Sequence, residues 1–480
     1  MLAPLIPNSP TCQQQTQNPQ NTHYSLALNE AKNISNISLP MILTGLLLYS
    51  RSMISMLFLG HLGELALAGG SLAIGFANIT GYSVLSGLAM GMEPICGQAF
   101  GAKRFTLLGL TMQRMVLILL LTSIFIASLW LNMNKLLLLC GQQEDIAKEA
   151  QLYILYSLPD LAAQSLLHPL RIYLRSQSIT FPLTCCAALS ILLHIPINYL
   201  LVSMLKLGIK GVALSAVWTN FNFVGSLIIY IIVSGTYKAT WNGISWRCFR
   251  NWKALLNLAI PSCVSVCLEW WWYEIMTLLC GLLLNPKASV ASMGVLIQTT
   301  SLMYIFPSSL SFGVSIRVGN ELGAGNPYHA KIAAIVGVCF SFVLGFFAFV
   351  FAVSVRNFWA SMFTMDNEII DLTRIVLPIV GICEFGNCPQ TTVCGVLRGT
   401  ARPKLGANIN LCCFYVVGMP VAVWLSFFGG FDFEGLWIGM LAAQGCCMVT
   451  MMFVLVHTNW NGQAQRAEEL MSCDQGDEEQ

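Results

Sequence analysis

Long apolar stretches, separated by short polar segments, recur from one end of the chain to the other. A helix needs about 20 mostly apolar residues to cross the hydrocarbon core of a bilayer. Twelve stretches meet that need, and we predict each of them to be a transmembrane helix. They lie at residues 36–59, 66–92, 106–131, 147–169, 180–204, 211–233, 255–284, 288–315, 329–355, 369–396, 405–428 and 435–457. The pattern therefore predicts an all-α membrane protein.

The second half of the pattern repeats the first. Five pairs of segments match in order, at a nearly constant spacing of 221 to 224 residues. Pro40 and Pro261 open spans one and seven, and GQAFGAK (97–103) corresponds to GNELGAG (319–325). A constant offset over several matches indicates two homologous halves. Because six spans per half insert the same way up, we predict two pseudo-symmetric six-helix lobes around a central cleft, as in alternating-access transporters.

Polar segments set the expected domain boundaries. Residues 1–32 are rich in Pro, Gln, Asn and Thr and lack the apolar core of a signal peptide, so we expect a disordered tail. The two lobes occupy residues 33–233 and 255–457, joined by a basic linker at 234–254. Residues 458–480 are polar and mostly acidic, and we expect them to form a second solvated tail.

Basic residues indicate which ends of the spans face the cytosol. The loops after even-numbered spans hold 13 Lys and Arg residues, against 7 after odd-numbered spans. An even number of spans leaves both tails on one side, so we expect the tails and the linker to be cytosolic. The sequence contains no KDEL-type address. It leaves the plasma membrane, vacuole, Golgi and late endosome open as locations, and we expect a monomer.

Composition agrees with a membrane protein. Hydrophobic residues make up 56% of the chain and charged residues 10%, whereas a soluble domain carries about 25% charged residues. The net charge of +2 gives no reason to expect a nucleic-acid partner. The 18 cysteines lie mostly in apolar runs without C-x-x-C spacing, and the 6 histidines are scattered. We therefore expect no metal site and no cofactor.

Two carboxylates interrupt the seventh span, in the segment CLEWWWYEIM (267–276). A charge at mid-bilayer costs at least roughly 2.5–3.5 kcal/mol on insertion scales, which makes such a residue a functional candidate. Burial favours the protonated form of a carboxyl group, and water or a cation can then displace the proton. Glu269 and Glu274 are separated by about 140° around an ideal helix. We expect Glu269 to face the cleft and Glu274 to be a second, more packed carboxyl.

Other polar positions within the spans are candidates for the same cleft. Glu384 in span ten is a further candidate for proton coupling. Asp160 in span four fits a cleft position and a structural role beside Pro159 equally well. Asn78 and Gln298 occupy nearly symmetric positions in the two halves, and we expect them to line the cleft as a pair.

The aromatic run beside Glu269 has two interpretations. Trp270 and Tyr273 can bind a flat cation through their ring faces, and the whole run fits helix packing equally well. Arg51, a cation within span one, is expected to take a hydrogen-bonded packing role. The glycine-rich segments 97–103 and 319–325 lack the Lys-Ser/Thr pair of a phosphate loop, so we interpret them as tight cytosolic turns.

At four segments the chain resembles the multidrug and toxic compound extrusion (MATE) family, and it looks like a member of the plant detoxification branch. The segments are EPICGQAFGAKR (93–104), CLEWWWYE (267–274), RVGNELGAGNP (317–327) and GVLRGTARPKLGANINLCCFYVVGMP (395–420). They occur in both halves, so the resemblance covers about residues 33–460.

The resemblance implies two lobes in a V shape and export of organic solutes in exchange for protons. It implies a proton-coupling role for Glu269, with Glu274 and Glu384 as further acids. Where some animal members carry an acid in span eight, this sequence has Gln298. The resemblance therefore does not extend to a strongly cation-selective site.

Other classes of protein fit the sequence less well. A major-facilitator carrier also has six plus six spans, but its loop after span two needs an acid that GQAFGAKR lacks. A lipid or large-solute flippase of the same fold would expose a polar groove to lipid, and a channel would conduct without stoichiometric proton movement. No Ser/His or His/Asp constellation indicates an enzyme.

Overall fold

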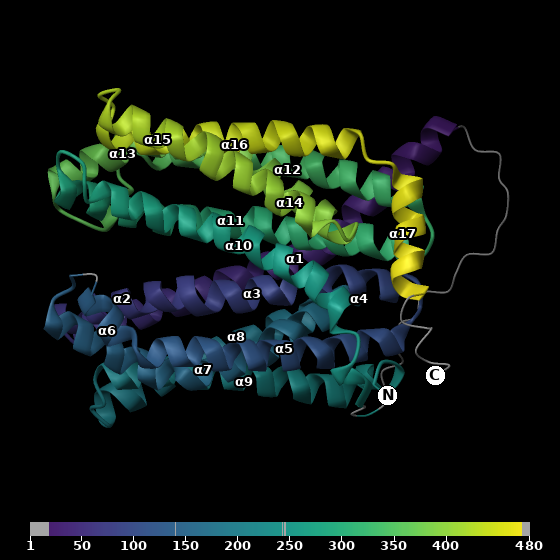
Figure 1. Ribbon diagram of the computed structural model, residues 1–480, viewed down its shortest axis with the longest axis horizontal. Coiled ribbons are helices and arrows are strands. Elements are labelled where there is room, and N and C mark those ends of the chain that lie inside the picture. Colours follow the sequence, from purple (N-terminus) through teal and green to yellow (C-terminus); the bar gives the residue numbers. More distant parts are fainter. Residues whose placement is uncertain (1–18, 140, 242, 244–245, 473–480) are drawn as a thin grey trace.

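The computed structural model describes residues 19–139, 141–241, 243 and 246–472. Within these residues the chain is helical and contains no strand. Figure 1 shows two layers of long helices lying side by side, one from each half of the chain.

The first half forms six long helical segments. They are α1 (Pro19–His61), the run of α2 (Glu64–Ala77), η1 (Asn78–Tyr82), α3 (Ser83–Met90) and α4 (Met92–Gly101), then α5 (Phe105–Leu131), α7 (Glu144–Ser176), α8 (Phe181–Asn198) with η2 (Tyr199–Met204), and α9 (Ile209–Ser234). A short helix, α6 (Met133–Leu139), precedes α7, and η1 and η2 are π-helical. Two 3₁₀ turns, η3 (Thr236–Ala239) and η4 (Trp246–Phe249), lie in the linker.

The second half also forms six long segments. They are α10 (Trp252–Cys280), α11 (Pro286–Gly323), α12 (Pro327–Val355), α13 (Asn367–Gly399), the run of α14 (Pro403–Asn410), the π-helix η6 (Leu411–Gly418) and α15 (Met419–Phe427), and α16 (Asp432–Val456). The 3₁₀ turn η5 (Ala360–Met362) precedes α13, and α17 (Trp460–Ser472) follows α16. Prolines begin α11, α12 and α14, where the fixed φ of proline suits the first helical turn.

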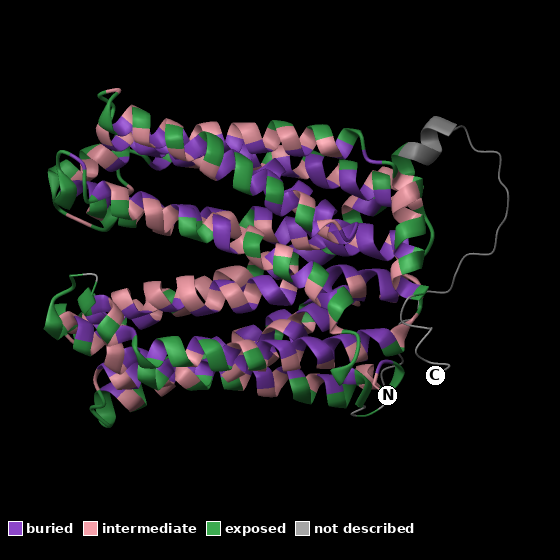
Figure 2. Cartoon of the chain, in the orientation of Figure 1, coloured by how far each residue is buried: buried purple, intermediate pink, exposed green. Residues whose placement is uncertain are grey.

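Ten of the long segments in the described part of the chain are apolar enough to span a membrane by length and composition. The other two are α7 and α13, each 33 residues long. They correspond to the fourth and tenth predicted spans, which contain Asp160 and Glu384. Many large apolar side chains, such as Phe346 and Phe347, remain exposed on the outside of the bundle, where lipid would cover them (Figure 2).

Each lobe has its own apolar core, and one helix of each lobe reaches into the other. The first core is built from the later part of α1 and from α2 to α9, and it also includes Leu255 and Ala259, at the start of α10. The second core is built from the later part of α10 and the helices after it, and it also includes Ile34, near the start of α1. The starts of α1 and α10 therefore attach the two lobes to each other in a pseudo-symmetric way.

The start of the chain differs from the expected tail. Helix α1 begins at Pro19, and Glu30 is 5% exposed against the second lobe. Arg317 on α11 donates to both carboxylate oxygens of Glu30, at 2.7 and 3.0 Å, and also pairs with Glu321. A bidentate ion pair of this kind stabilises the contact and also fixes the relative orientation of the two side chains. The expectation of disorder is therefore wrong for residues 19–32, and residues 1–18 lie outside the described part.

The end of the chain also differs from the expected solvated tail. Helix α17 lies across the end of the molecule where the lobes meet (Figure 1). Its Ala467 belongs to the core of the second lobe and its Met471 to the core of the first. Arg104 Nη1 donates to the backbone oxygen of Met471 at 2.6 Å. Residues 460–472 are thus a packed strap between lobes, and residues 473–480 lie outside the described part.

The two glycine-rich segments are mostly helix ends that pack against each other, and the predicted turns are confined to residues 102–103 and 324–325. Cβ atoms built on Gly97 and Gly319 would each lie about 3.5 Å from the Cα atom of the other. A Cβ on Gly101 would lie 1.9 Å from the Asn320 carbonyl oxygen, and one on Gly323 2.0 Å from that of Gln98. Only residues without a side chain allow α4 and α11 to approach this closely. We call this contact the closed end.

We expect Gly101→Ala to destabilise the protein, because its methyl group must push the α11 backbone away. Overpacking of this kind typically costs about 1–3 kcal/mol. Gly225→Ala on α9 is the matched control, since a Cβ there meets nothing within 4 Å. Thermal midpoints in detergent, measured by size-exclusion chromatography after heating, should fall for Gly101→Ala and stay level or rise for Gly225→Ala. Equal midpoints would show that the closed end does not limit stability.

Candidate functional site: the cavity between the lobes

A cavity of about 230 Å³ lies between the two lobes. The first lobe lines it with α3 and the end of α7, and the second with α10, α11, α13 and the start of α14. Its lining includes Glu269 and Trp270, together with Arg171, Arg175 and Arg398. Charged side chains from both halves of the chain therefore face one space.

Side chains from three other helices hold the carboxylate of Glu269. Asn410 Nδ2, at the end of α14, donates to Oε1 at 2.9 Å, and Gln390 Nε2 on α13 donates to it at 3.4 Å. Tyr304 Oη on α11 donates to Oε2 at 3.5 Å. Asn410 Nδ2 also donates to Ser265 Oγ, one turn earlier on α10, at 3.0 Å. These donors satisfy the carboxylate oxygens, while the position of Glu269 in the cavity lining keeps the group reachable by water.

The aromatic run beside Glu269 divides among three environments. Trp270 is 44% exposed and lines the cavity. Trp271 turns toward the first lobe, where its Nε1 donates to the Ile79 backbone oxygen at 3.5 Å. Trp272 is fully buried in the second lobe, edge-on to the ring of Phe414 at 5.5 Å. Trp270 is thus the tryptophan of the run that a solute in this cavity would touch.

Glu384 lies deeper in the second lobe and is 2% exposed. Its Oε2 accepts from Asn387 Nδ2 at 2.9 Å, and Asn387 Oδ1 accepts from Thr391 Oγ1 at 3.2 Å. Tyr273 interacts electrostatically with both Glu384 and Glu269. Both carboxylates of the second lobe therefore act electrostatically on the same tyrosine.

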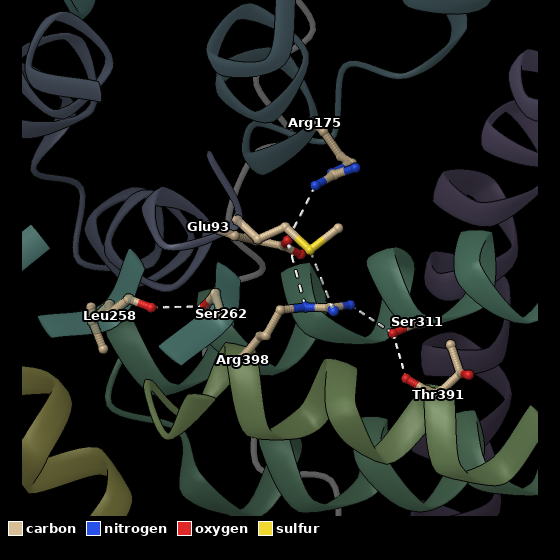
Figure 3. Close-up of polar contacts among 8 residues, drawn as sticks. Glu93, Arg175, Leu258, Ser262, Ser311, Thr391 and Arg398 are labelled. Carbon is tan, nitrogen blue, oxygen red and sulfur yellow. Dashed lines mark hydrogen bonds and ion pairs between the residues drawn. The ribbon is translucent and has the colours of Figure 1, made fainter. Parts of the chain in front are cut away.

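An ion pair joins the lobes beside the cavity (Figure 3). Glu93 on α4, 2% exposed, is 3.2 Å from Arg175 Nη2 of its own lobe and 3.8 Å from Arg398 Nε of the other. The ring centre of Phe312 on α11 lies 3.8 Å from the Arg175 guanidinium carbon and 5.5 Å from that of Arg398. Charge attraction and cation–π contacts therefore both cross the boundary between the lobes. We call the cluster of Glu93, Arg175, Arg398 and Phe312 the inter-lobe bridge.

Successive hydrogen bonds connect Glu384 to the inter-lobe bridge. They run through Asn387 to Thr391, whose backbone oxygen accepts from Ser311 Oγ at 2.6 Å. Ser311 Oγ in turn accepts from Arg398 Nη2 at 2.7 Å, as drawn in Figure 3. Asn387, Thr391 and Ser311 therefore lie between Glu384 and the inter-lobe bridge, each in contact with the next.

Similarity to known protein families identifies the family of this chain. The family model described as MatE matches residues 40–200 and again residues 261–424. Together these ranges make up more than half of the chain, and they begin at the paired prolines Pro40 and Pro261. The chain belongs to the MATE family. It is therefore a multi-pass membrane efflux transporter and not an enzyme, and the major-facilitator interpretation is excluded.

Individual MATE relatives match over nearly the whole chain. Protein DETOXIFICATION 49 of Arabidopsis thaliana is 67% identical over 484 residues, covering 100% of this chain and 96% of the relative. Protein DETOXIFICATION 48 of the same plant is 60% identical, covering 93% and 84%. These matches confirm the predicted resemblance to the plant detoxification branch.

Solved MATE structures confirm the all-α fold. The crystal structure of the eukaryotic MATE transporter AtDTX14 superposes with a TM-score of 0.89 at 32% identity, covering 92% of this chain and 99% of that one. A crystal structure of a mutant of the MATE transporter VcmN from Vibrio cholerae has a TM-score of 0.80 at 18% identity, covering 93% and 99%. The latter shows the shared fold alone.

In this MATE transporter, Asp160 lies inside the first lobe and outside the cavity lining described above. It is 3% exposed, and its two oxygens accept from Asn220 Nδ2 at 2.6 Å and Gln164 Nε2 at 3.4 Å. Arg51 donates to the side-chain oxygen of the same Asn220. Arg51 thus has the hydrogen-bonded role expected for it, and Asn220 bridges it to an acid.

Glu384 and Tyr273 lie outside the lining of this cavity too, and so do three further predicted site residues. Glu274 is partly buried, and no hydrogen bond of its side chain is found in the described part of the chain. Asn78 begins the π-helix η1. Gln298 offers its backbone oxygen to Tyr49 Oη at 3.3 Å. Their roles in proton coupling or solute binding remain predictions.

Sequence reasoning missed most of the polar partners in the site. Asn410, Gln390 and Tyr304 are polar residues inside predicted spans, and that position in an apolar stretch is the signal the sequence carries for them. Asn410 is followed directly by η6, and π-helical turns are frequent at functional sites. Such a turn is not recognisable in the sequence.

Proposed function

We propose that this MATE transporter exports small organic solutes from the cytosol in exchange for protons, with Glu269 as the proton-coupling carboxyl. Proton and solute compete for the same cavity in opposite states of the transport cycle. Glu384 serves as a second proton-binding group in the same lobe, and Trp270 provides an aromatic surface for the solute.

The observation that carries this proposal is the environment of Glu269. It is a carboxyl within a membrane helix that faces the cavity, and donors on three further helices hold its oxygens. Loss or gain of a proton there changes the hydrogen bonds that α10 makes with α11, α13 and α14. Protonation can therefore shift the balance between two arrangements of these helices.

Alternating access gives the two ends of the molecule different roles. The closed end, α17 and the inter-lobe bridge all lie toward the side that carries the linker, which the basic residues predict to be cytosolic. We infer that this conformation keeps the cavity closed to the cytosol. Solute loading then requires the inter-lobe bridge and the closed end to separate.

Transport by the purified full-length protein in proteoliposomes tests the proposal. With an imposed pH gradient, we expect uptake of a fluorescent organic cation such as ethidium to depend on the gradient and to stop when a protonophore removes it. Conducted current without proton movement would indicate a channel, and movement of labelled lipid without solute uptake would indicate a flippase. Either result would overturn proton exchange.

We expect Glu93→Gln to weaken the inter-lobe bridge, since the neutral amide loses its charge attraction for Arg175 and Arg398. The variant should shift the protein toward conformations in which the closed end is open. Accessibility of a cysteine placed at Gly97 to a membrane-impermeant maleimide should rise several-fold relative to the same cysteine in the Glu93-containing protein. Unchanged labelling would show that the bridge does not control opening.

A further inference from the structure

The cavity has more positive than negative charge. Three guanidinium groups line it, those of Arg171, Arg175 and Arg398. Glu93 pairs with two of them, Arg175 and Arg398, and Glu269 is the acid in the lining. One guanidinium, that of Arg171, therefore has no carboxylate assigned to it.

Arg171 is surrounded by cations. Among the described residues, the charged groups that interact with it are Arg175 and Arg51. Its neighbour His168 also lines the cavity and interacts with Arg171 and Arg175, which adds no negative charge. The Nε atom of Arg171 is buried and has no hydrogen-bond partner. Arg171 as a whole is half-buried, and a half-buried guanidinium among cations is stabilised by an anion, so a partner is expected from outside the chain.

The geometry points to an anionic group on the transported solute as that partner: we propose that the cavity takes organic solutes bearing a carboxylate or similar oxyanion, which binds Arg171. The planar fork of arginine matches an oxyanion through two parallel hydrogen bonds. The rest of the solute then lies against Trp270, which also lines the cavity. This inference rests on the proposed export function and specifies its substrate class.

The other two arginines are not equivalent to Arg171. The guanidinium of Arg175 lies over Phe312 and pairs with Glu93. That of Arg398 donates to Ser311 and pairs with the same Glu93. Since both are already engaged across the lobe boundary, Arg171 is the residue whose loss should affect an anionic group most selectively.

Binding of rhodamine B and of its ethyl ester to the purified full-length protein tests the inference. The two dyes share a cationic ring system and differ in the free carboxylate, so the ratio of their Kd values isolates the anionic group. By fluorescence anisotropy, we expect the wild type to bind the acid at least roughly tenfold more tightly than the ester. Arg171→Gln should bring this ratio close to one, and Arg171→Lys should restore part of it.

Two controls make the result specific. Ester binding by Arg171→Gln reports whether the variant is folded, because the ester does not need the arginine. Arg356→Gln removes one positive charge from an exposed residue outside the cavity lining and should leave the ratio unchanged.

Equal binding of the two dyes by the wild type would overturn the inference. Equal weakening of both dyes by Arg171→Gln would also overturn it, because Arg171 would then be a structural residue. Absence of pH-driven uptake of the acid in the same preparation would instead overturn proton exchange. In that case, a ratio that still depends on Arg171 would leave the anion site standing.

Discussion

Glu269→Gln is expected to abolish uptake driven by a pH gradient in proteoliposomes. Glutamine keeps the shape of the side chain and can still hydrogen-bond to Asn410 and Tyr304, but it cannot exchange a proton. The loss should exceed tenfold, since no other carboxyl lines the cavity in the described part of the chain. Uptake of ethidium, with and without the imposed gradient, measures it.

Two variants serve as comparisons for this result. Glu274→Gln removes a carboxyl five positions further along the same helix, outside the cavity lining, and should retain most of the uptake. Glu384→Gln should reduce uptake by an intermediate amount, because that carboxyl lies outside the cavity lining and is hydrogen-bonded through Asn387 to Thr391, which lines the cavity. Full gradient-dependent uptake by Glu269→Gln would move proton coupling to Glu384 or Glu274.

Locking the closed end should stop transport reversibly. We expect a double variant, Gly97→Cys with Gly319→Cys, to form a disulfide on oxidation, because the Cβ atoms built at these positions lie 3.6 and 3.5 Å from the opposite Cα atoms. Neither Cβ would meet a backbone atom closer than this. If the closed end must open in every cycle, the oxidised protein cannot load solute. Uptake should fall at least roughly tenfold, because the covalent cross-link holds the closed end shut.

The disulfide experiment includes its own reversal. Dithiothreitol should restore uptake by the double variant, while each single cysteine variant should be insensitive to oxidation. The single variants also control for Cys96, which is buried next to Gly97. Wild-type uptake by a protein whose cross-link is verified by mass spectrometry would show that the closed end stays shut throughout transport.

Much of the architecture followed from local features of the sequence. The length of each apolar stretch predicted six long helices per half, because a membrane-spanning helix must satisfy its backbone groups internally. The apolar pattern also predicts long helices at the places of α7 and α13, in spite of their acids. The packing of the two terminal segments does not follow from their composition. A polar composition indicates that a segment can be solvated, but it does not show whether the segment packs against the rest of the protein. Glu30 looks like a surface residue until Arg317 is placed beside it.

The site was predictable only in part. An acid in a membrane helix is unusual on its own, so Glu269 and Glu384 could be selected without a structure. Their partners could not, because Gln390 and Asn410 follow Glu269 by 121 and 141 positions and become neighbours only when the helices pack. The role of Arg171 could not be predicted either, because it depends on the absence of a nearby carboxylate among the described residues.

The sequence by itself determined the helices, their repeat and the carboxyls that membrane burial makes functional candidates, since hydrophobic length and residue charge are local properties. Tertiary structure alone decided which charges are compensated. Glu93 and Arg398, from different lobes, meet in the inter-lobe bridge, and Arg171 faces the cavity among cations. The physical reason is that an electrostatic interaction depends on distance in space, and the packing of the two lobes sets that distance.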